Sequence, residues 1–167
     1  MYTNTLPEQL VSYLIHHQIT ISTAESCSGG LISKLITDIP GCSAIYPGGV
    51  CAYSNEMKIK WLNVSASTLE QHGAVSAETA LEMAQGVRIA TQSKYGISTT
   101  GIAGPGGGSA EKPVGLVYIA VVGETDHRVE KLPLDPNIPL TRANIQAQAA
   151  HYALQLLWEM LQQTYEQ

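Results

Sequence analysis

The sequence contains no phenylalanine, and tyrosine and tryptophan together make up only 6% of its 167 residues. Charged residues are also few, at 14%, and fourteen acidic residues outnumber nine basic ones, which gives a formal net charge of −5. A protein that binds nucleic acid by neutralising many phosphates needs the opposite sign of charge. We therefore expect no nucleic acid among the partners of this chain.

Cysteine is scarce as well. The three cysteines, Cys27, Cys42 and Cys51, form no CxxC pair, and the five histidines show no HxxH or HExxH spacing. An odd number of cysteines at these spacings argues against a disulfide framework and against a structural zinc site. We predict no metal and no cofactor, and a chain that functions in the reducing cytoplasm.

The sequence has no hydrophobic run long enough to cross a membrane. Its longest apolar stretch, 114–122, is far shorter than the roughly 20 residues that a membrane-spanning helix needs. The first ten residues, MYTNTLPEQL, lack the basic and apolar regions of a signal peptide. We therefore expect neither export nor attachment to a membrane.

What the sequence does contain is an alternation of helical and strand patterns within a length typical of one domain, 1–167. Helices are expected at 6–18, from 31 to before Pro40, and at 55–62, 65–71, 76–93 and 141–160, and strands at 19–23, 49–54, 97–102, 114–122 and 127–132. The last two strands are separated by four turn-forming residues, GETD, so they should form an antiparallel hairpin. The pattern predicts a three-layer α/β/α sandwich with a mixed, mostly parallel sheet of about five strands.

The first candidate for chemistry is the ESCSGG segment at 25–30, between a predicted strand and a helix. Backbone N–H groups at a helix N-terminus can hold an anion or a developing oxyanion, so Ser26 is well placed as a nucleophile. The alternative is structural, with Ser26 or Ser28 capping the helix. Glu25 is either a second acid, a ligand for a ribose hydroxyl, or a carboxylate that complements the helix dipole.

The second candidate segment is YSNEMK, which places Tyr53, Asn55 and Lys58 at the beginning of a short helix with Asn55 as the expected N-cap. A lysine in the first turn opposes the helix dipole. If it is removed from water its pKa falls, and it can then act as a base toward Ser26. The alternative is a surface lysine that covers apolar area with its stem.

The third candidate is the glycine-rich stretch from Thr99 to Ser109. It leads into a strand rather than opening a helix and contains no Gly-Lys-Ser/Thr, so it is neither a dinucleotide fingerprint nor a P-loop. Its glycines let the backbone approach either the phosphate or ribose of a ligand, or a neighbouring loop or subunit.

Four blocks of this sequence, TAESCSGG, GGVCAYSNEMK, LEQHGAVS and TGIAGPGGGSAEKPVGLVY, occur in that order between positions 23 and 118. Together they resemble the C-terminal domain family of the competence-associated protein CinA. The resemblance implies a nicotinamide-nucleotide amidase, which converts nicotinamide mononucleotide (NMN) and water to nicotinate mononucleotide and ammonia. It covers none of the large N-terminal domain of full-length CinA proteins, so no activity of that domain is carried over.

The resemblance also implies roles for individual residues. Ser26 would be the nucleophile, assisted by Tyr53 and Lys58. Arg142, one of three arginines in the chain, would open the last helix and face an anion. The substrate contacts implied in this way are Cys27, Gly29, Gly30, Asn55, Thr100, Gly101, Gly106, Gly107 and Arg142.

Two other interpretations stay open from the sequence. Cys27 could replace Ser26 as the nucleophile. The chain could also be a non-catalytic nucleotide-binding or interaction module, in which the glycine-rich segment and Arg142 bind a ligand without converting it. Relatives commonly form homo-oligomers, so we expect a homo-oligomer here, with NMN as its small-molecule partner.

Overall fold

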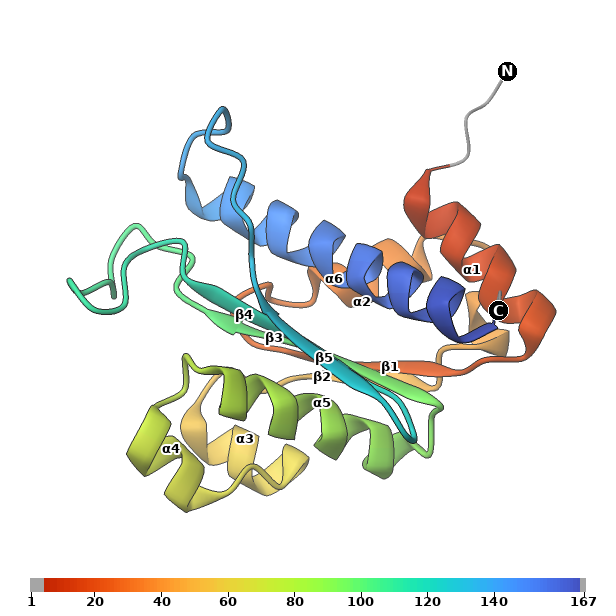
Figure 1. Cartoon of the computed structure of the whole chain (residues 1–167), viewed down its shortest axis with the longest axis horizontal. Helices are drawn as coiled ribbons and strands as arrows, with labels where there is room; N and C mark the ends of the chain where they lie inside the picture. The colour runs from red at the N-terminus through yellow and green to blue at the C-terminus, as the bar shows by residue number, and fades with distance from the viewer. Residues whose placement is uncertain (1–4, 166–167) are drawn as a thin grey trace.

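A five-stranded sheet lies at the centre of the molecule, in the order β2-β1-β3-β4-β5 (Figure 1). The computed structural model describes residues 5–165, so Met1 to Asn4 of the amino-terminal segment discussed above lie outside the described residues. The strands are β1 (Ile21–Glu25), β2 (Gly48–Cys51), β3 (Tyr95–Gly101), β4 (Val117–Val122) and β5 (His127–Lys131). The first three strands are parallel, and β4 and β5 are antiparallel to their neighbours, which confirms the predicted mixed sheet.

Helices cover both faces of this sheet, which confirms the predicted three-layer sandwich (Figure 1). One face carries α1 (Leu6–His17), α2 (Leu31–Thr37) and α6 (Arg142–Tyr165), and the other carries α3 (Asn55–Leu62), α4 (Ala66–His72) and α5 (Ala77–Thr91). A short 3-10 helix, η1 (Cys42–Ala44), precedes β2. With a helical layer on each side, all five residues of β1 are buried, as expected for an interior parallel strand.

The hydrophobic core is built without phenylalanine, mainly from aliphatic side chains. The larger cluster lies between the sheet and the layer of α1, α2 and α6. The long helix α6 contributes a 3.6-period stripe to it, made of Ile145, Ala149, Ala153, Leu156, Leu157, Met160 and Leu161. On the other face, Leu62 of α3 packs with Met83 and Val87 of α5 against β1 and β2.

Several expected boundaries were wrong by a few residues, among them the end of β2 at Cys51 and the start of β3 at Tyr95, and three further ones have an evident physical reason. The first strand begins at Ile21 rather than at position 19, because the N–H of Ile19 still donates to Leu14 at the end of α1. It continues through Glu25, whose buried carboxylate is held by backbone N–H groups. The fourth strand begins at Val117, after Gly115 adopts a φ of +94°. The N-cap of α3 is Ser54 instead of Asn55, and the Ser54 hydroxyl accepts from the backbone N–H of Met57.

The carboxyl ends of β1, β2 and β3 meet at one edge of the sheet. Glu25 is the register partner of both Cys51 on β2 and Thr99 on β3, so the segments that follow these strands lie side by side. Residues 102–116 connect β3 to antiparallel β4 at this same edge. Open α/β sheets bind ligands at such an edge. No helix among residues 5–165 is long and apolar enough to cross a membrane.

Candidate active site

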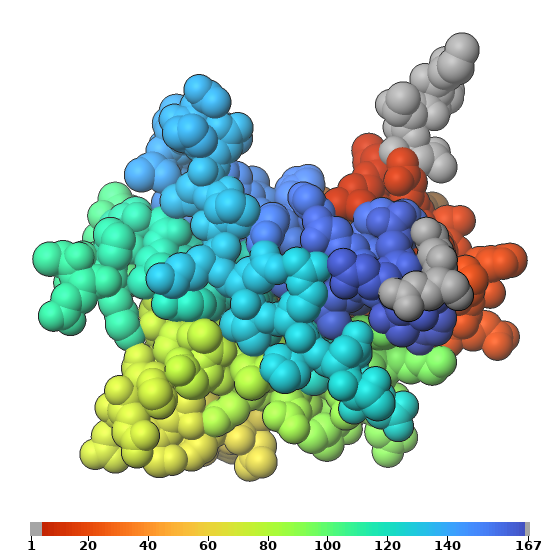
Figure 2. All heavy atoms as spheres, in the orientation of Figure 1, coloured from red at the N-terminus to blue at the C-terminus, as the bar shows by residue number. Residues whose placement is uncertain are grey.

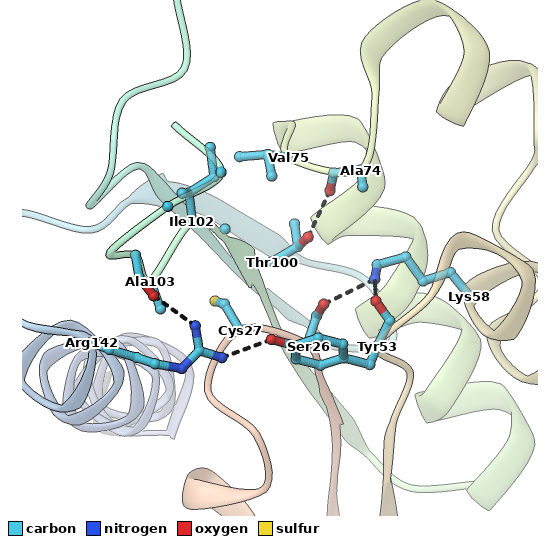
Figure 3. A pocket seen from close by; sticks show the side chains of 14 residues that line it. Ser26, Cys27, Tyr53, Lys58, Ala74, Val75, Thr100, Ile102, Ala103 and Arg142 are labelled. Carbon is cyan, nitrogen blue, oxygen red and sulfur yellow. Dashed lines mark hydrogen bonds between the residues drawn. The ribbon is translucent and has the colours of Figure 1, made fainter. Parts of the chain in front are cut away.

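A cavity of about 250 Å³ opens at this edge, between the carboxyl ends of the strands and the beginning of α6 (Figure 3). It brings together all three segments singled out in the sequence. Its lining residues are Ser26, Cys27, Tyr53, Lys58, Ala74, Val75, Thr100, Gly101, Ile102, Ala103, Gly104, Gly106, Gly107 and Arg142. None of the described residues that line it carries a carboxylate.

Ser26 and Lys58 are in direct contact in this cavity. The Nζ of Lys58 donates a hydrogen bond of 2.9 Å to the Oγ of Ser26 (Figure 3). The turn that presents Ser26 is fastened to the sheet, because the backbone N–H of Ser26 donates to the carbonyl oxygen of Thr99 at 3.0 Å. The predicted juxtaposition of a hydroxyl and an amine is therefore present.

Lys58 is one of the most buried side chains in the protein, with only 1% of its surface exposed. Its Nζ also donates to the carbonyl oxygens of Ala52 at 2.8 Å and Tyr53 at 3.4 Å. Burial lowers the pKa of Lys58 below that of an exposed lysine, and the Cys27 thiol opposes this shift. The geometry excludes the alternative of a surface lysine and gives a buried amine whose pKa lies below that of an exposed lysine.

Glu25 stabilises the turn that carries Ser26. Its fully buried carboxylate accepts hydrogen bonds from the backbone N–H groups of Gly30, Ile32 and Ser33, and from the hydroxyls of Ser28 and Ser33. A carboxylate at this position satisfies N–H groups at the beginning of α2 and complements the helix dipole. Of the roles considered for Glu25, the structure matches this structural one.

Cys27 lines the cavity beside Ser26 but is poorly suited to be the nucleophile. Only 5% of its surface is exposed, and burial raises the pKa of its thiol to about 12. The thiolate is the nucleophilic form of cysteine, and at neutral pH it would be almost absent here. The contact with Lys58 belongs to Ser26, so the structure favours the hydroxyl over the thiol.

Tyr53 lies at the mouth of the cavity, with 63% of its surface exposed. Its carbonyl oxygen contacts Lys58, whereas its hydroxyl accepts a hydrogen bond of 2.7 Å from Nη2 of Arg142 (Figure 3). The Nη1 of Arg142 donates to the carbonyl oxygen of Gly104 at 2.9 Å. Two protein acceptors therefore hold Arg142 in place, and its interaction with an anion stays a prediction.

The glycine-rich segment contributes to the cavity in several ways. The Oγ1 of Thr100 donates to the carbonyl oxygen of Ala74 at 2.6 Å. Gly101 packs so closely on β4 that a Cβ would lie 2.6 Å from the carbonyl oxygen of Leu116. This close packing requires a glycine at position 101, and no ligand is needed to explain it. A Cβ on Gly106 would meet no atom within 4 Å, and the backbone there is not left-handed. Nothing in the described protein requires a glycine at position 106.

Three of the predicted substrate contacts do not line the cavity. Gly29 and Gly30 lie in the turn behind Ser26, where their N–H groups donate to the carbonyl oxygen of Ser26 and to Glu25. Asn55 is exposed at the beginning of α3. Their roles toward a substrate stay predictions. Among residues 5–165, no group of three or more His, Cys, Asp or Glu is arranged to hold a metal ion.

The sequence analysis missed Ala74, Val75 and Gln146. Ala74 and Val75 form a wall of the cavity within the LEQHGAVS block, but small apolar side chains carry no chemical signature. Gln146, one turn after Arg142 on α6, donates from its Nε2 to the carbonyl oxygen of Cys27 at 2.9 Å. Its position four residues after Arg142 could have indicated that both side chains face the same site.

Comparison with known proteins agrees with this fold. The CinA C-terminal domain family matches residues 3–161. This chain belongs to the CinA C-terminal domain family. Among curated relatives, the family includes a CinA-like protein of Amoebophilus asiaticus, 47% identical over 160 residues, which are 96% of this chain and 38% of that protein. A CinA-like protein of Leptospira interrogans is 47% identical over 154 residues, 92% of this chain and 36% of that protein.

Solved structures of the CinA superfamily share the fold. The competence/damage inducible protein CihA from Agrobacterium tumefaciens is 36% identical, with a TM-score of 0.85 over 96% of this chain and 98% of that chain. A CinA superfamily protein from Escherichia coli is 29% identical, with a TM-score of 0.86 over 93% of this chain and 88% of that chain. The chain thus matches these structures almost end to end, but spans little more than a third of the two CinA-like relatives.

Proposed function

We propose that this CinA-family chain is a nicotinamide-nucleotide amidase that converts NMN and water to nicotinate mononucleotide and ammonia. The observation that carries the proposal is the 2.9 Å contact between Lys58 Nζ and Ser26 Oγ, made by a lysine that is 1% exposed. A hydroxyl next to a buried amine is the arrangement that activates a serine for attack on an amide. The family resemblance supplies the substrate.

The hydrogen bonds of Lys58 are compatible with its action as a base. Two of its three partners are the carbonyl oxygens of Ala52 and Tyr53, which can only accept. When Lys58 is neutral, its two N–H groups can bind these carbonyls, and the Ser26 hydroxyl then donates to the lone pair of Nζ instead of accepting from it. The neutral lysine can thus take the Ser26 proton without losing either carbonyl contact.

The proposed reaction is a two-step acyl transfer. Ser26 Oγ attacks the amide carbon of the nicotinamide group while Lys58 takes the hydroxyl proton. The carbon–nitrogen bond then breaks, Lys58 returns the proton to the leaving nitrogen, and ammonia departs. Water attacks the resulting ester with Lys58 again as base, which releases nicotinate mononucleotide and restores the serine hydroxyl.

The developing oxyanion needs N–H donors close to Ser26. The N–H of Gly29 already donates to the carbonyl oxygen of Ser26, and the N–H of Gly30 donates to the Glu25 carboxylate. We therefore assign the binding of the oxyanion to the backbone N–H groups of Cys27 and Ser28. Their turn is held by the buried carboxylate of Glu25 and by the Gln146 contact to Cys27. Such fixed donors need no reorganisation during the reaction.

The phosphate of NMN is assigned to the Arg142 side of the cavity. A guanidinium has five N–H donors, and Arg142 uses two of them on Tyr53 and Gly104, so three remain. Gly106, whose missing side chain no protein contact explains, lets the backbone approach the ribose 5′-phosphate. The lack of carboxylates in the lining favours an anionic group in the cavity.

The test is an ammonia and product assay on the purified chain with NMN, nicotinamide and NAD in parallel. We expect ammonia from NMN, and loss of at least about a thousandfold in kcat for Ser26→Ala and for Lys58→Ala. Cys27→Ala and thiol alkylation should leave most of the activity. Activity that survives Ser26→Ala and disappears in Cys27→Ala would transfer the nucleophile to Cys27.

Calorimetry with NMN distinguishes the amidase from a non-catalytic module. Binding of NMN without ammonia release would contradict the amidase and favour a nucleotide-binding role. Absence of both would remove NMN as the ligand. The expected homo-oligomer is tested separately by light scattering on the same preparation.

A further inference from the structure

Lys112 joins the glycine-rich loop, residues 103–113, to a second wall of the cavity. Its Nζ donates to the carbonyl oxygens of His72 at 2.7 Å and Val75 at 2.9 Å, in the turn between α4 and α5. Val75 lines the cavity, and so does the beginning of the glycine-rich loop. In Figure 1 the loop projects beyond the ends of β3 and β4, and in Figure 2 its atoms lie above those of α4. The Lys112 ammonium thus connects two walls of the cavity.

The turn between α4 and α5 is held by side chains rather than by a regular backbone ladder. The carbonyl oxygen of Gly73 accepts from the hydroxyls of Ser76 and Thr79. The carbonyl oxygen of Ala74 accepts from Thr100. Together with the two carbonyls bound by Lys112, every carbonyl from His72 to Val75 has a side-chain donor. Loss of Lys112 would leave two of these four without their donor.

The other end of the contact is equally well defined. The backbone N–H of Lys112 donates to Ser109 Oγ at 3.0 Å, and the N–H of Ser109 donates to the carbonyl oxygen of Lys112 at 2.8 Å. This tight turn fixes where the Lys112 side chain begins. Arg142 holds the opposite end of the loop through Gly104. The loop is therefore fastened on both sides of Gly106 and Gly107, which face the cavity.

We propose that Lys112 is a positioning residue, which fastens the glycine-rich loop beside the cavity and thereby sets the affinity for substrate. The proposal rests on the proposed amidase function for the identity of that substrate. Lys112 does not line the cavity, and its Nζ donates to two backbone carbonyls rather than to Ser26 or Lys58. Its loss should therefore weaken substrate binding and leave the acyl-transfer steps largely unchanged.

The test compares Lys112→Met, which keeps the aliphatic stem and removes the ammonium, with Lys112→Arg and with the exposed control Lys60→Met. We expect the KM for NMN to rise about tenfold in Lys112→Met, because both charge-assisted hydrogen bonds that fasten the loop are lost, and kcat to stay within about twofold. Lys112→Arg should recover most of the affinity. Hydrogen–deuterium exchange of residues 104–111 should be faster in Lys112→Met and unchanged in Lys60→Met.

These readouts separate the proposal from the function on which it rests. If the wild-type chain releases no ammonia from NMN, the amidase is contradicted, and hydrogen exchange still decides whether Lys112 fastens the loop. Unchanged exchange in Lys112→Met would overturn the proposal. Faster exchange with an unchanged KM, or a loss in kcat alone, would overturn the role in substrate binding. If Lys112→Met fails to fold, Lys112→Gln is measured in its place.

Discussion

The hydroxyl of Tyr53 accepts a hydrogen bond of 2.7 Å from Arg142 across the mouth of the cavity. Tyr53 precedes α3, and Arg142 begins α6. In the described structure, neither the Tyr53 hydroxyl nor the Arg142 guanidinium forms a hydrogen bond with Lys58 Nζ. Tyr53 thus reaches the reacting groups only through its backbone carbonyl. We therefore expect its phenol to orient Arg142 rather than to transfer a proton.

Tyr53→Phe should therefore impair binding more than chemistry. The substitution removes one hydrogen bond to a charged group, so we expect KM for NMN to rise about tenfold and kcat to change by less than about threefold. Steady-state kinetics on the purified variant measure both constants. A large loss of kcat with an unchanged KM would instead show that the phenol takes part in proton transfer.

Lys58 should give the activity a characteristic pH dependence. Burial lowers the pKa of Lys58 below its ordinary value of 10.5, and only the neutral amine can act as the base. We expect kcat/KM to rise with pH through this lowered pKa and to level off below pH 10.5. The profile of Cys27→Ala should show the same rise, which distinguishes Lys58 from the buried thiol.

The same residue should leave a signature in stability. The pKa of Lys58 is lower in the folded chain than in the unfolded chain. Between these two pKa values the unfolded chain binds more protons, so the free energy of unfolding rises with pH in this range and falls as pH is lowered. Lys58→Met removes this titration and also the hydrogen bonds to the Ala52 and Tyr53 carbonyls, so the prediction concerns the pH dependence alone. Thermal unfolding from pH 7 to 10 should show wild type gaining stability relative to Lys58→Met as pH rises, and a difference independent of pH would contradict the assignment.

Gly106 and Gly107 should respond differently to alanine. A methyl group on Gly106 meets no protein atom within 4 Å, so Gly106→Ala should leave the unfolding temperature unchanged and raise KM for NMN. Gly107 has a φ of +83°, so Gly107→Ala should cost about 1 to 2 kcal/mol of stability. Calorimetric unfolding and kinetics on both variants check this. An unchanged KM in Gly106→Ala would contradict the assignment of a ligand contact to this part of the loop.

Glu25→Gln should destabilise the protein. The carboxylate accepts from three backbone N–H groups and two hydroxyls, whereas glutamine would turn an NH₂ group toward donors. We expect a loss of about 2 to 4 kcal/mol in the free energy of unfolding, measured in urea. Glu78→Gln is the control, because Glu78 is exposed, and it should change stability by less than about 0.5 kcal/mol. Equal effects in the two variants would contradict the role of Glu25.

The sequence was sufficient to predict the layers, but it left open whether Lys58 meets Ser26 or lies on the surface, and only the family resemblance favoured the pairing. Both residues follow parallel strands that are neighbours in the sheet and end at the same edge, which brings them near each other. The N-cap of α3 was misplaced because Ser54 and Asn55 are both good capping residues, and local preference cannot choose between neighbours.

Other features depended on contacts that only the folded chain reveals. The bounds of β1 were missed at both ends. The backbone N–H of Ile19 still donates to Leu14 at the end of α1, and Glu25 was expected in the turn, although its carboxylate is held by N–H groups at the beginning of α2. The partners of Arg142 are 38 and 89 residues away along the chain. Gly101 resembled a ligand-binding glycine but is required by the close approach of β4. The spacing of residues in the sequence does not reveal these contacts between distant segments.

The antiparallel step from β3 to β4 has a consequence for how such a fold can diversify. Because residues 102–116 leave and re-enter the sheet at the same edge, this connection crosses neither helical layer. Insertions or deletions here would reshape the entrance to the cavity while the five strands keep their register. Variation in substrate among proteins with this framework should therefore concentrate in this one connection.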